Sequence, residues 1–204
     1  MRRTLRSVCA LALFVCNVLL GQQQSSEVRP PDAERSLARL RSKIDVERPP
    51  DLTTNAIVGR YSDTPDELRR RVVPMGRKDL YLFPDGSYFY YFSSDIPPAT
   101  IRDKGAWVLS GDELTLKSDS DITWNPGVER RYLFVRRPSH PQEILAIGID
   151  RDLRYFEENA KDDPEFMLLL VSKARVNGIS AKESIELKKK LMREAWRPEF
   201  YRSQ

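Results

Sequence analysis

Cysteine and histidine are nearly absent from this chain of 204 residues. Its two cysteines are Cys9 and Cys16, and its one histidine is His140. Both cysteines lie close to the N-terminus, so residues 22–204 offer no disulfide, no thiol nucleophile and no cysteine metal site. A single histidine without cysteine partners does not make up a transition-metal site. We therefore expect neither a metal nor a cofactor.

Catalytic motifs are missing as well. There is no glycine-rich phosphate loop, and a Ser-His-Asp triad would depend on His140 without a nucleophile-elbow sequence. Acidic pairs, which hydrolysis of glycosides or calcium binding would use, do occur. They are Glu157-Glu158, Asp162-Asp163, and Asp119 with Asp121. We interpret them as solvated turns and His140 as a solvated turn residue, and expect no enzyme; a carboxylate-based hydrolase is the alternative.

Long hydrophobic runs are absent except near the N-terminus. The arginines that precede this run are Arg2, Arg3 and Arg6. The uncharged, mainly apolar run 8–20 is shorter than the roughly 20 residues of a membrane-spanning helix and fits a signal peptide. We predict a signal peptide 1–21, with Gly21 as the last residue removed, and a secreted or periplasmic protein without a transmembrane span. An uncleaved N-terminal anchor is the alternative.

Excess charge is also lacking once the signal is removed. The chain has 34 basic and 30 acidic residues, and removing the three arginines of the signal leaves 31 against 30, a net of about +1. This balance argues against a nucleic-acid partner. The remaining basic clusters, Arg69–Arg71 and Lys188–Lys190, are typical of a solvated loop and a helix surface; an anionic partner or membrane surface is the alternative.

Residues 22–55 read as a polar leader that contains one short amphipathic helix. Leu37, Leu40 and Ile44 recur at helical spacing within 32–46. Because this apolar stripe is narrow, the helix is expected to form by packing on the remainder of the protein. Residues 56–204 are predicted to form a single globular domain.

Strands are predicted from residue 57 to residue 156. The strongest signal is 79–92, where two β-prone runs flank the turn Pro84-Asp85-Gly86. The predicted pairing of Phe83 with Ser87 gives the hairpin a leucine-bearing face and an aromatic face. The first face holds Leu80, Leu82, Tyr88 and Tyr90, and the second holds Tyr81, Phe83, Phe89 and Tyr91. We place the leucine face in the interior and expect a cover over the aromatic face.

Further strands follow the same pattern. A second hairpin is predicted at 105–116, a third pair at 131–136 and 144–149, and a last short strand at 154–156. Such a series of short strands predicts an antiparallel meander that curls into a barrel or sandwich.

Two C-terminal helices are predicted to supply the cover. The first, 164–177, begins after Asp163 with Pro164 at its first position. The second, 181–196, begins with a capping box of Ser180 and Glu183. The predicted fold class is therefore α+β: a meander with a short N-terminal helix and two C-terminal helices packed on the sheet.

Three segments together resemble small lipocalin-like domains of bacterial secreted proteins. They are Val58-Gly59-Arg60-Tyr61, Leu80–Tyr88 with its Asp-Gly turn, and Gly105-Ala106-Trp107 followed by Gly111-Asp112-Glu113-Leu114. The resemblance covers about half of the chain. It implies a β-barrel with an apolar cavity, and it carries over no catalytic residue.

These observations favour an exported, non-catalytic barrel that binds a small apolar ligand or a protein partner. Tyr88, Tyr90 and Trp107 are the candidate ligand-binding residues, although aromatic residues of strands also serve as core. The first alternative is a structural or interaction module of the cell envelope with a filled interior. The second is the carboxylate-based hydrolase.

Overall fold

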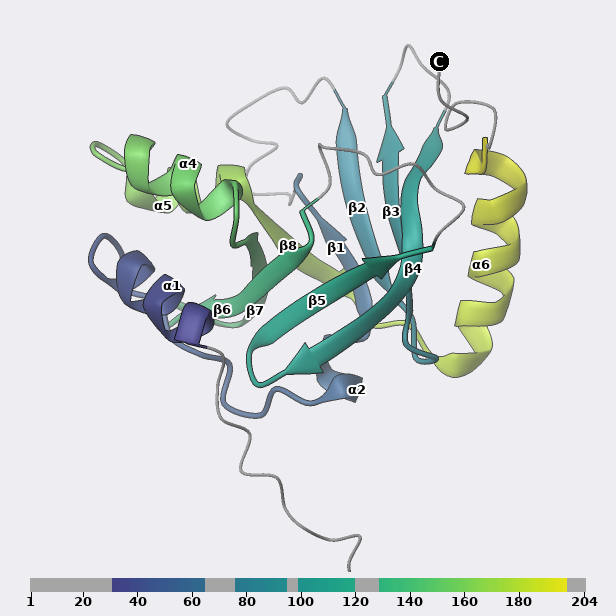
Figure 1. Cartoon of the computed structure of the whole chain (residues 1–204), viewed down its shortest axis with the longest axis horizontal. Helices are drawn as coiled ribbons and strands as arrows, with labels where there is room; N and C mark the ends of the chain where they lie inside the picture. Colours follow the sequence, from purple (N-terminus) through teal and green to yellow (C-terminus); the bar gives the residue numbers. More distant parts are fainter. Residues whose placement is uncertain (1–30, 65–75, 95–98, 120–128, 198–204) are drawn as a thin grey trace, which may run out of the picture.

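The computed structural model describes residues 31–64, 76–94, 99–119 and 129–197, and in these ranges eight strands form one closed barrel (Figure 1). Each strand pairs antiparallel with the next, and the last pairs with the first, so the sheet closes on itself. The strands are β1 (Gly59–Ser62), β2 (Arg77–Leu82), β3 (Ser87–Ser93), β4 (Thr100–Ser110), β5 (Glu113–Ser118), β6 (Arg131–Arg137), β7 (His140–Gly148) and β8 (Ser172–Asn177). Of the two predicted architectures, the barrel is confirmed.

Five helices accompany the barrel within the described ranges. They are α1 (Pro31–Arg41), α2 (Thr54–Ile57), α4 (Asp152–Asn159), α5 (Pro164–Val171) and α6 (Ala181–Ala195). No helix of the described residues is long and apolar enough to cross a membrane. The predicted signal peptide 1–21 and the beginning of the leader, residues 22–30, lie outside the described residues.

The hairpin of β2 and β3 has the predicted register. Leu82 pairs with Tyr88 and Leu80 with Tyr90, and Gly86 takes the positive φ of 78° that the turn requires. Leu80 also pairs with Tyr61, whose ring lies 5.6 Å from the ring of Phe134 on the non-adjacent strand β6. Contact between non-neighbouring strands occurs only across the interior, so the leucine face points inward as predicted.

Helix α6 covers the aromatic outer face of this hairpin. It stands beside β4 in Figure 1, and its buried Leu191 belongs to the same core cluster as Phe83 and Phe89. The rings of Phe83 and Phe89 meet edge to face at 5.2 Å, and the Lys188 ammonium lies 4.7 Å from the centre of the Phe83 ring. The capping box of Ser180 and Glu183 at its start is confirmed.

The first C-terminal helix differs from the prediction. Helix α5 ends at Val171 instead of continuing to residue 177, and Ser172–Asn177 forms β8. As a strand, this segment pairs with both β1 and β7, which removes the two edges that the sheet would otherwise expose. This long-range pairing outweighs the local helical signal.

A group of helices covers the β6 and β7 side of the barrel. Helix α5 packs there with α4 and α1, against the outward-facing Leu133, Val135, Leu145 and Ile147. The predicted strand 154–156 is wrong, because these residues lie in α4. Leu153 and Phe156 are spaced three residues apart, so a helix buries both on one face, whereas a strand would divide them.

The leader is part of the same folded unit. Helix α1 ends at Arg41, earlier than the predicted 46, and it buries Leu37 and Leu40. The chain then runs along the barrel, where Glu47 exchanges two backbone hydrogen bonds of 2.9 Å with Arg136 of β6. Arg48 forms an ion pair of 2.7 Å with Asp112 at the β4–β5 turn.

The two ends of the barrel differ. The closed end carries α2 and the tight turns of β2–β3, β4–β5 and β6–β7, and its interior is filled by fully buried side chains such as Tyr61, Leu82 and Phe134. The opposite end, which we call the mouth, is where β1, β3, β5 and β7 finish. The packed closed end leaves the mouth as the place for a site.

Candidate functional site

A pocket of about 290 Å³ opens at the mouth, between the barrel and helices α4 and α5. Its charged lining residues are Asp63, Lys78, Arg151, Asp152 and Lys173. Its aromatic and apolar lining residues are Tyr90, Tyr155, Leu170 and Val171. We call this hollow the mouth pocket.

Lys173 is placed at the base of the mouth pocket by the strand β8. It pairs with Ala146, and alternation along β8 turns its side chain inward while Ala174 packs in the outer core. Lys173 is only 4% exposed. Its ammonium lies 5.7 Å from the ring centre of Tyr90 and 5.6 Å from that of Tyr132, in the range of cation–π contact.

The Lys173 ammonium has no carboxylate within ion-pair distance among the described residues. Burial acts to lower the pKa of Lys173, but Tyr90, Asp152 and Asp63 outweigh it, and the pKa is raised. The side chain is therefore a cation at neutral pH. A buried cation held by aromatic faces, without a direct counterion, is the most unusual charged group of the mouth.

Lys78 at the start of β2 adds a second cation. Its pKa is lowered, first by desolvation and then by the positive charge of Lys173. The ammonium groups of Lys78 and Lys173 repel each other across the mouth pocket. This repulsion indicates a local positive charge that neighbouring carboxylates neutralise only in part.

Both carboxylates of the mouth pocket are engaged by neighbouring groups. Asp63 accepts a 2.9 Å hydrogen bond from the backbone N–H of Lys78, and its pKa is raised chiefly by burial. Asp152 accepts a 3.3 Å hydrogen bond from the Arg151 guanidinium. Glu129 fixes the start of α4 by accepting hydrogen bonds from the backbone N–H groups of Arg151 and Asp152 at 2.5 and 3.2 Å.

The three residues proposed from the sequence occupy different places. Tyr90 lines the mouth pocket. Tyr88 is buried and donates a 2.8 Å hydrogen bond to Asp103, and Trp107 donates from Nε1 to the Phe83 carbonyl at 3.3 Å near the closed end. The structure therefore brings only Tyr90 to the pocket.

Sequence reasoning missed Lys173 because residues 164–177 were assigned to one helix. In a helix, Lys173 would be an ordinary polar surface residue. The alternation of polar and apolar residues along Ser172–Asn177 is a signal for a strand, but the inward direction of Lys173 follows only from its pairing with Ala146.

Two other buried carboxylates, Asp103 and Asp79, belong to ion pairs. Asp103 is fully buried and meets Arg130 at 3.1 Å, with a 2.6 Å hydrogen bond from Ser118. Asp79 on the outer face of β2 is held by Arg60 at 3.1 Å and Arg77 at 2.9 Å. These carboxylates have cationic partners and serve the packing of the barrel.

The remaining polar candidates are dispersed. His140 is exposed at the β6–β7 turn, where its Nδ1 lies 2.9 Å from Ser139 Oγ. Glu157 pairs with Arg39, Asp163 caps α5, and Asp119 pairs with Lys104. Within the described ranges, no group of three histidine, cysteine, aspartate or glutamate side chains is arranged to hold a metal. Asp121 and Arg69–Arg71 lie outside the described residues.

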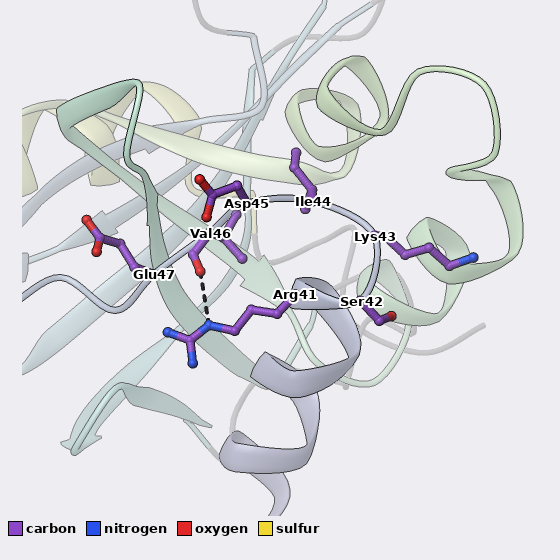
Figure 2. A pocket seen from close by; sticks show the side chains of 7 residues that line it. All are labelled: Arg41, Ser42, Lys43, Ile44, Asp45, Val46 and Glu47. Carbon is purple, nitrogen blue, oxygen red and sulfur yellow. Dashed lines mark hydrogen bonds between the residues drawn. The ribbon is translucent and has the colours of Figure 1, made fainter.

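A second hollow, of about 650 Å³, lies beside the leader (Figure 2). Consecutive residues of a single loop, 41–47, line it, and the Arg41 side chain closes the loop by donating to the Val46 carbonyl at 3.1 Å. Most of these residues are exposed. The hollow is therefore the open inside of a surface turn, and the mouth pocket is the stronger candidate.

Comparison of the chain with family models, with curated proteins and with solved structures found no match. The closed antiparallel barrel of eight strands agrees with a lipocalin-like architecture in general. The mouth pocket is therefore the feature of this barrel that bears on function.

Proposed function

We propose that the protein is an exported, non-catalytic barrel that binds a small molecule in the mouth pocket. The observation that carries the proposal is a pocket of about 290 Å³ whose base is charged and whose rim exposes apolar side chains. Small-molecule sites start at roughly 300 Å³ and combine an apolar lining with a few convergent polar groups. The lipocalin-like resemblance supports the same role, because it implies a barrel with a cavity.

A structural or interaction module of the cell envelope is the second candidate. Dense packing of the closed end favours it, since the fully buried side chains of Tyr61, Leu82 and Phe134 fill the interior there. In that case the barrel presents its outer surface to a protein partner, and the mouth pocket stays without a ligand.

A carboxylate-based hydrolase is the remaining candidate. Asp63 and Asp152 line one pocket, and the raised pKa of Asp63 suits a general acid. Against it, Asp152 is engaged by Arg151, and the acidic pairs recognised in the sequence are spread over separate elements. Hydrolysis of aryl glycosides that disappears in both Asp63→Asn and Asp152→Asn would favour this candidate.

The proposed function is tested by native mass spectrometry of the protein exported by its own N-terminus. Val171, the last residue of α5, lines the mouth pocket, whereas Val176 on β8 is exposed. We expect a bound mass on the wild type and on Val176→Trp, and none on Val171→Trp, whose larger side chain fills the pocket. Circular dichroism checks that both variants fold, because overpacking costs about 1–3 kcal/mol.

If no bound mass is seen on the wild type or on either variant, the result contradicts the proposal and favours the structural module. The same spectra give the export result: we expect the intact mass to lack residues 1–21.

A further inference from the structure

We infer that the mouth pocket takes a small organic anion, with the acidic group on the Lys173 ammonium and the apolar part against Tyr155 and Leu170. This inference rests on the proposed ligand-binding function and names its ligand class. Three observations support it: the burial of Lys173, the excess of cations over carboxylates among the described pocket residues, and the apolar rim of the pocket.

Burial of the Lys173 ammonium is the observation that points to an anionic ligand. Lysine is almost never fully buried unless it is paired, because desolvating an ammonium is costly. Here the residue is 4% exposed, and within the described ranges its ammonium meets two aromatic rings and no carboxylate at ion-pair distance. An acidic ligand group in the pocket supplies the missing partner.

The neighbouring charges leave this position open. Among the described residues, Lys78, Arg151 and Lys173 place three cations on the pocket against the two carboxylates Asp63 and Asp152. Asp152 is bonded to Arg151, and Asp63 is bonded to the backbone of Lys78. The two lysine ammoniums therefore face the pocket without direct counterions from the described residues, and one anion lowers their mutual repulsion.

The rim indicates that the anion carries an apolar group. Tyr155 and Leu170 are 49% and 39% exposed and belong to the few large apolar side chains that the described surface exposes. Both line the mouth pocket, from α4 and α5 respectively. A ring or short chain attached to the acid covers them, whereas an inorganic anion leaves them in water.

The test uses a matched series of ligands on the mature chain. 3-Phenylpropionate carries ring and charge, 3-phenylpropionamide has the ring alone, and 3-phenylpropylamine has the opposite charge. Acetate and inorganic phosphate carry negative charge without the ring. Binding is followed by NMR chemical-shift titration. We expect 3-phenylpropionate to bind at least about tenfold more tightly than each of the other four, which corresponds to about 1.4 kcal/mol.

Substitutions connect the preference to one side chain. Lys173→Met is expected to bind 3-phenylpropionate and its amide equally, and Lys173→Arg, which keeps the charge, is expected to retain the preference. Lys188→Met is the matched control, because Lys188 also lies over an aromatic ring, that of Phe83, but on the outer face of the barrel. The control should bind as the wild type does.

The outcomes separate the inference from the proposed function. Equal binding of acid and amide to the wild type contradicts the anion class and leaves a ligand-binding pocket standing. Phosphate or acetate binding as tightly as 3-phenylpropionate contradicts the organic part. A preference that survives in Lys173→Met contradicts the role of Lys173. Absence of binding by all five compounds contradicts the inference and the proposed function together.

Discussion

Two tyrosines of the barrel interior offer a pair of substitutions with opposite expected effects. Tyr61 and Tyr132 are both fully buried, and each becomes phenylalanine by loss of one oxygen atom. The Tyr61 hydroxyl donates a 2.9 Å hydrogen bond to the Ile57 carbonyl. The Tyr132 hydroxyl is buried and has no hydrogen-bond partner among the described residues.

The magnitudes follow from the cost of burying a hydroxyl. A buried hydroxyl without a partner costs about 1–3 kcal/mol, whereas a hydrogen-bonded one contributes about 1 kcal/mol to stability. We therefore expect Tyr132→Phe to raise the free energy of unfolding by about 1 kcal/mol. Tyr61→Phe is expected to lower it by about 1–2 kcal/mol, because the Ile57 carbonyl also loses its donor.

Urea denaturation followed by fluorescence measures both variants, provided that the slope against urea stays that of the wild type. The melting temperatures should move in opposite directions, by about 2–4 °C per kcal/mol in a domain of this size. Destabilisation of Tyr132→Phe to the same extent as Tyr61→Phe would refute the assignment of an unpartnered hydroxyl to Tyr132.

Two further predictions concern the cover of the barrel and its behaviour in alkali. Leu191→Ala should destabilise the protein by about 2–4 kcal/mol, because Leu191 is only 6% exposed. Ile185→Ala on the same helix should change stability by less than about 0.5 kcal/mol, because Ile185 is 56% exposed. Equal urea midpoints for the two variants would show that α6 is not docked on the barrel. Burial raises the pKa of several tyrosines, that of Tyr81 to about 12. Since these folded-state values lie above the unfolded value of about 10, their contribution to stability is complete below about pH 10 and is lost as the pH rises toward 12. Absorbance at about 295 nm should show tyrosine ionisation coinciding with unfolding, and full ionisation of a protein that keeps its near-ultraviolet dichroism would contradict this. The tyrosines concerned are Tyr61, Tyr81, Tyr88, Tyr90, Tyr91 and Tyr132.

Local patterns allowed much of the barrel to be predicted. Asp85-Gly86 fixes a tight turn, and the alternation on both sides of it fixes which side chains share a face, so the hairpin register followed from the sequence. The capping box of Ser180 and Glu183 likewise acts within one helical turn. Such signals depend only on residues close together in the chain, so they can be recognised without knowing the tertiary structure.

Closure of the barrel and the site depend on contacts that are distant in the sequence. Residues 172–177 become a strand because β1, more than a hundred residues earlier, offers an edge to pair with. As a strand between β1 and β7, this segment turns Lys173 inward, toward Tyr90 and Tyr132. Tyr90 can be picked out as a candidate from the sequence, because an aromatic residue in a predicted strand suggests a ligand contact. Lys173 cannot, because it reaches the pocket only when residues 172–177 form a strand.

The most direct measurement of the central claim observes the Lys173 side chain itself. With lysines labelled at the ε-carbon and assigned by substitution, NMR spectra are recorded while 3-phenylpropionate is added. We predict a large, saturable shift of the Lys173 signal, a smaller one for Lys78, which also lines the pocket, and no change for Lys188 on the outer face. A Lys173 signal that stays in place while the ligand binds elsewhere would contradict the account.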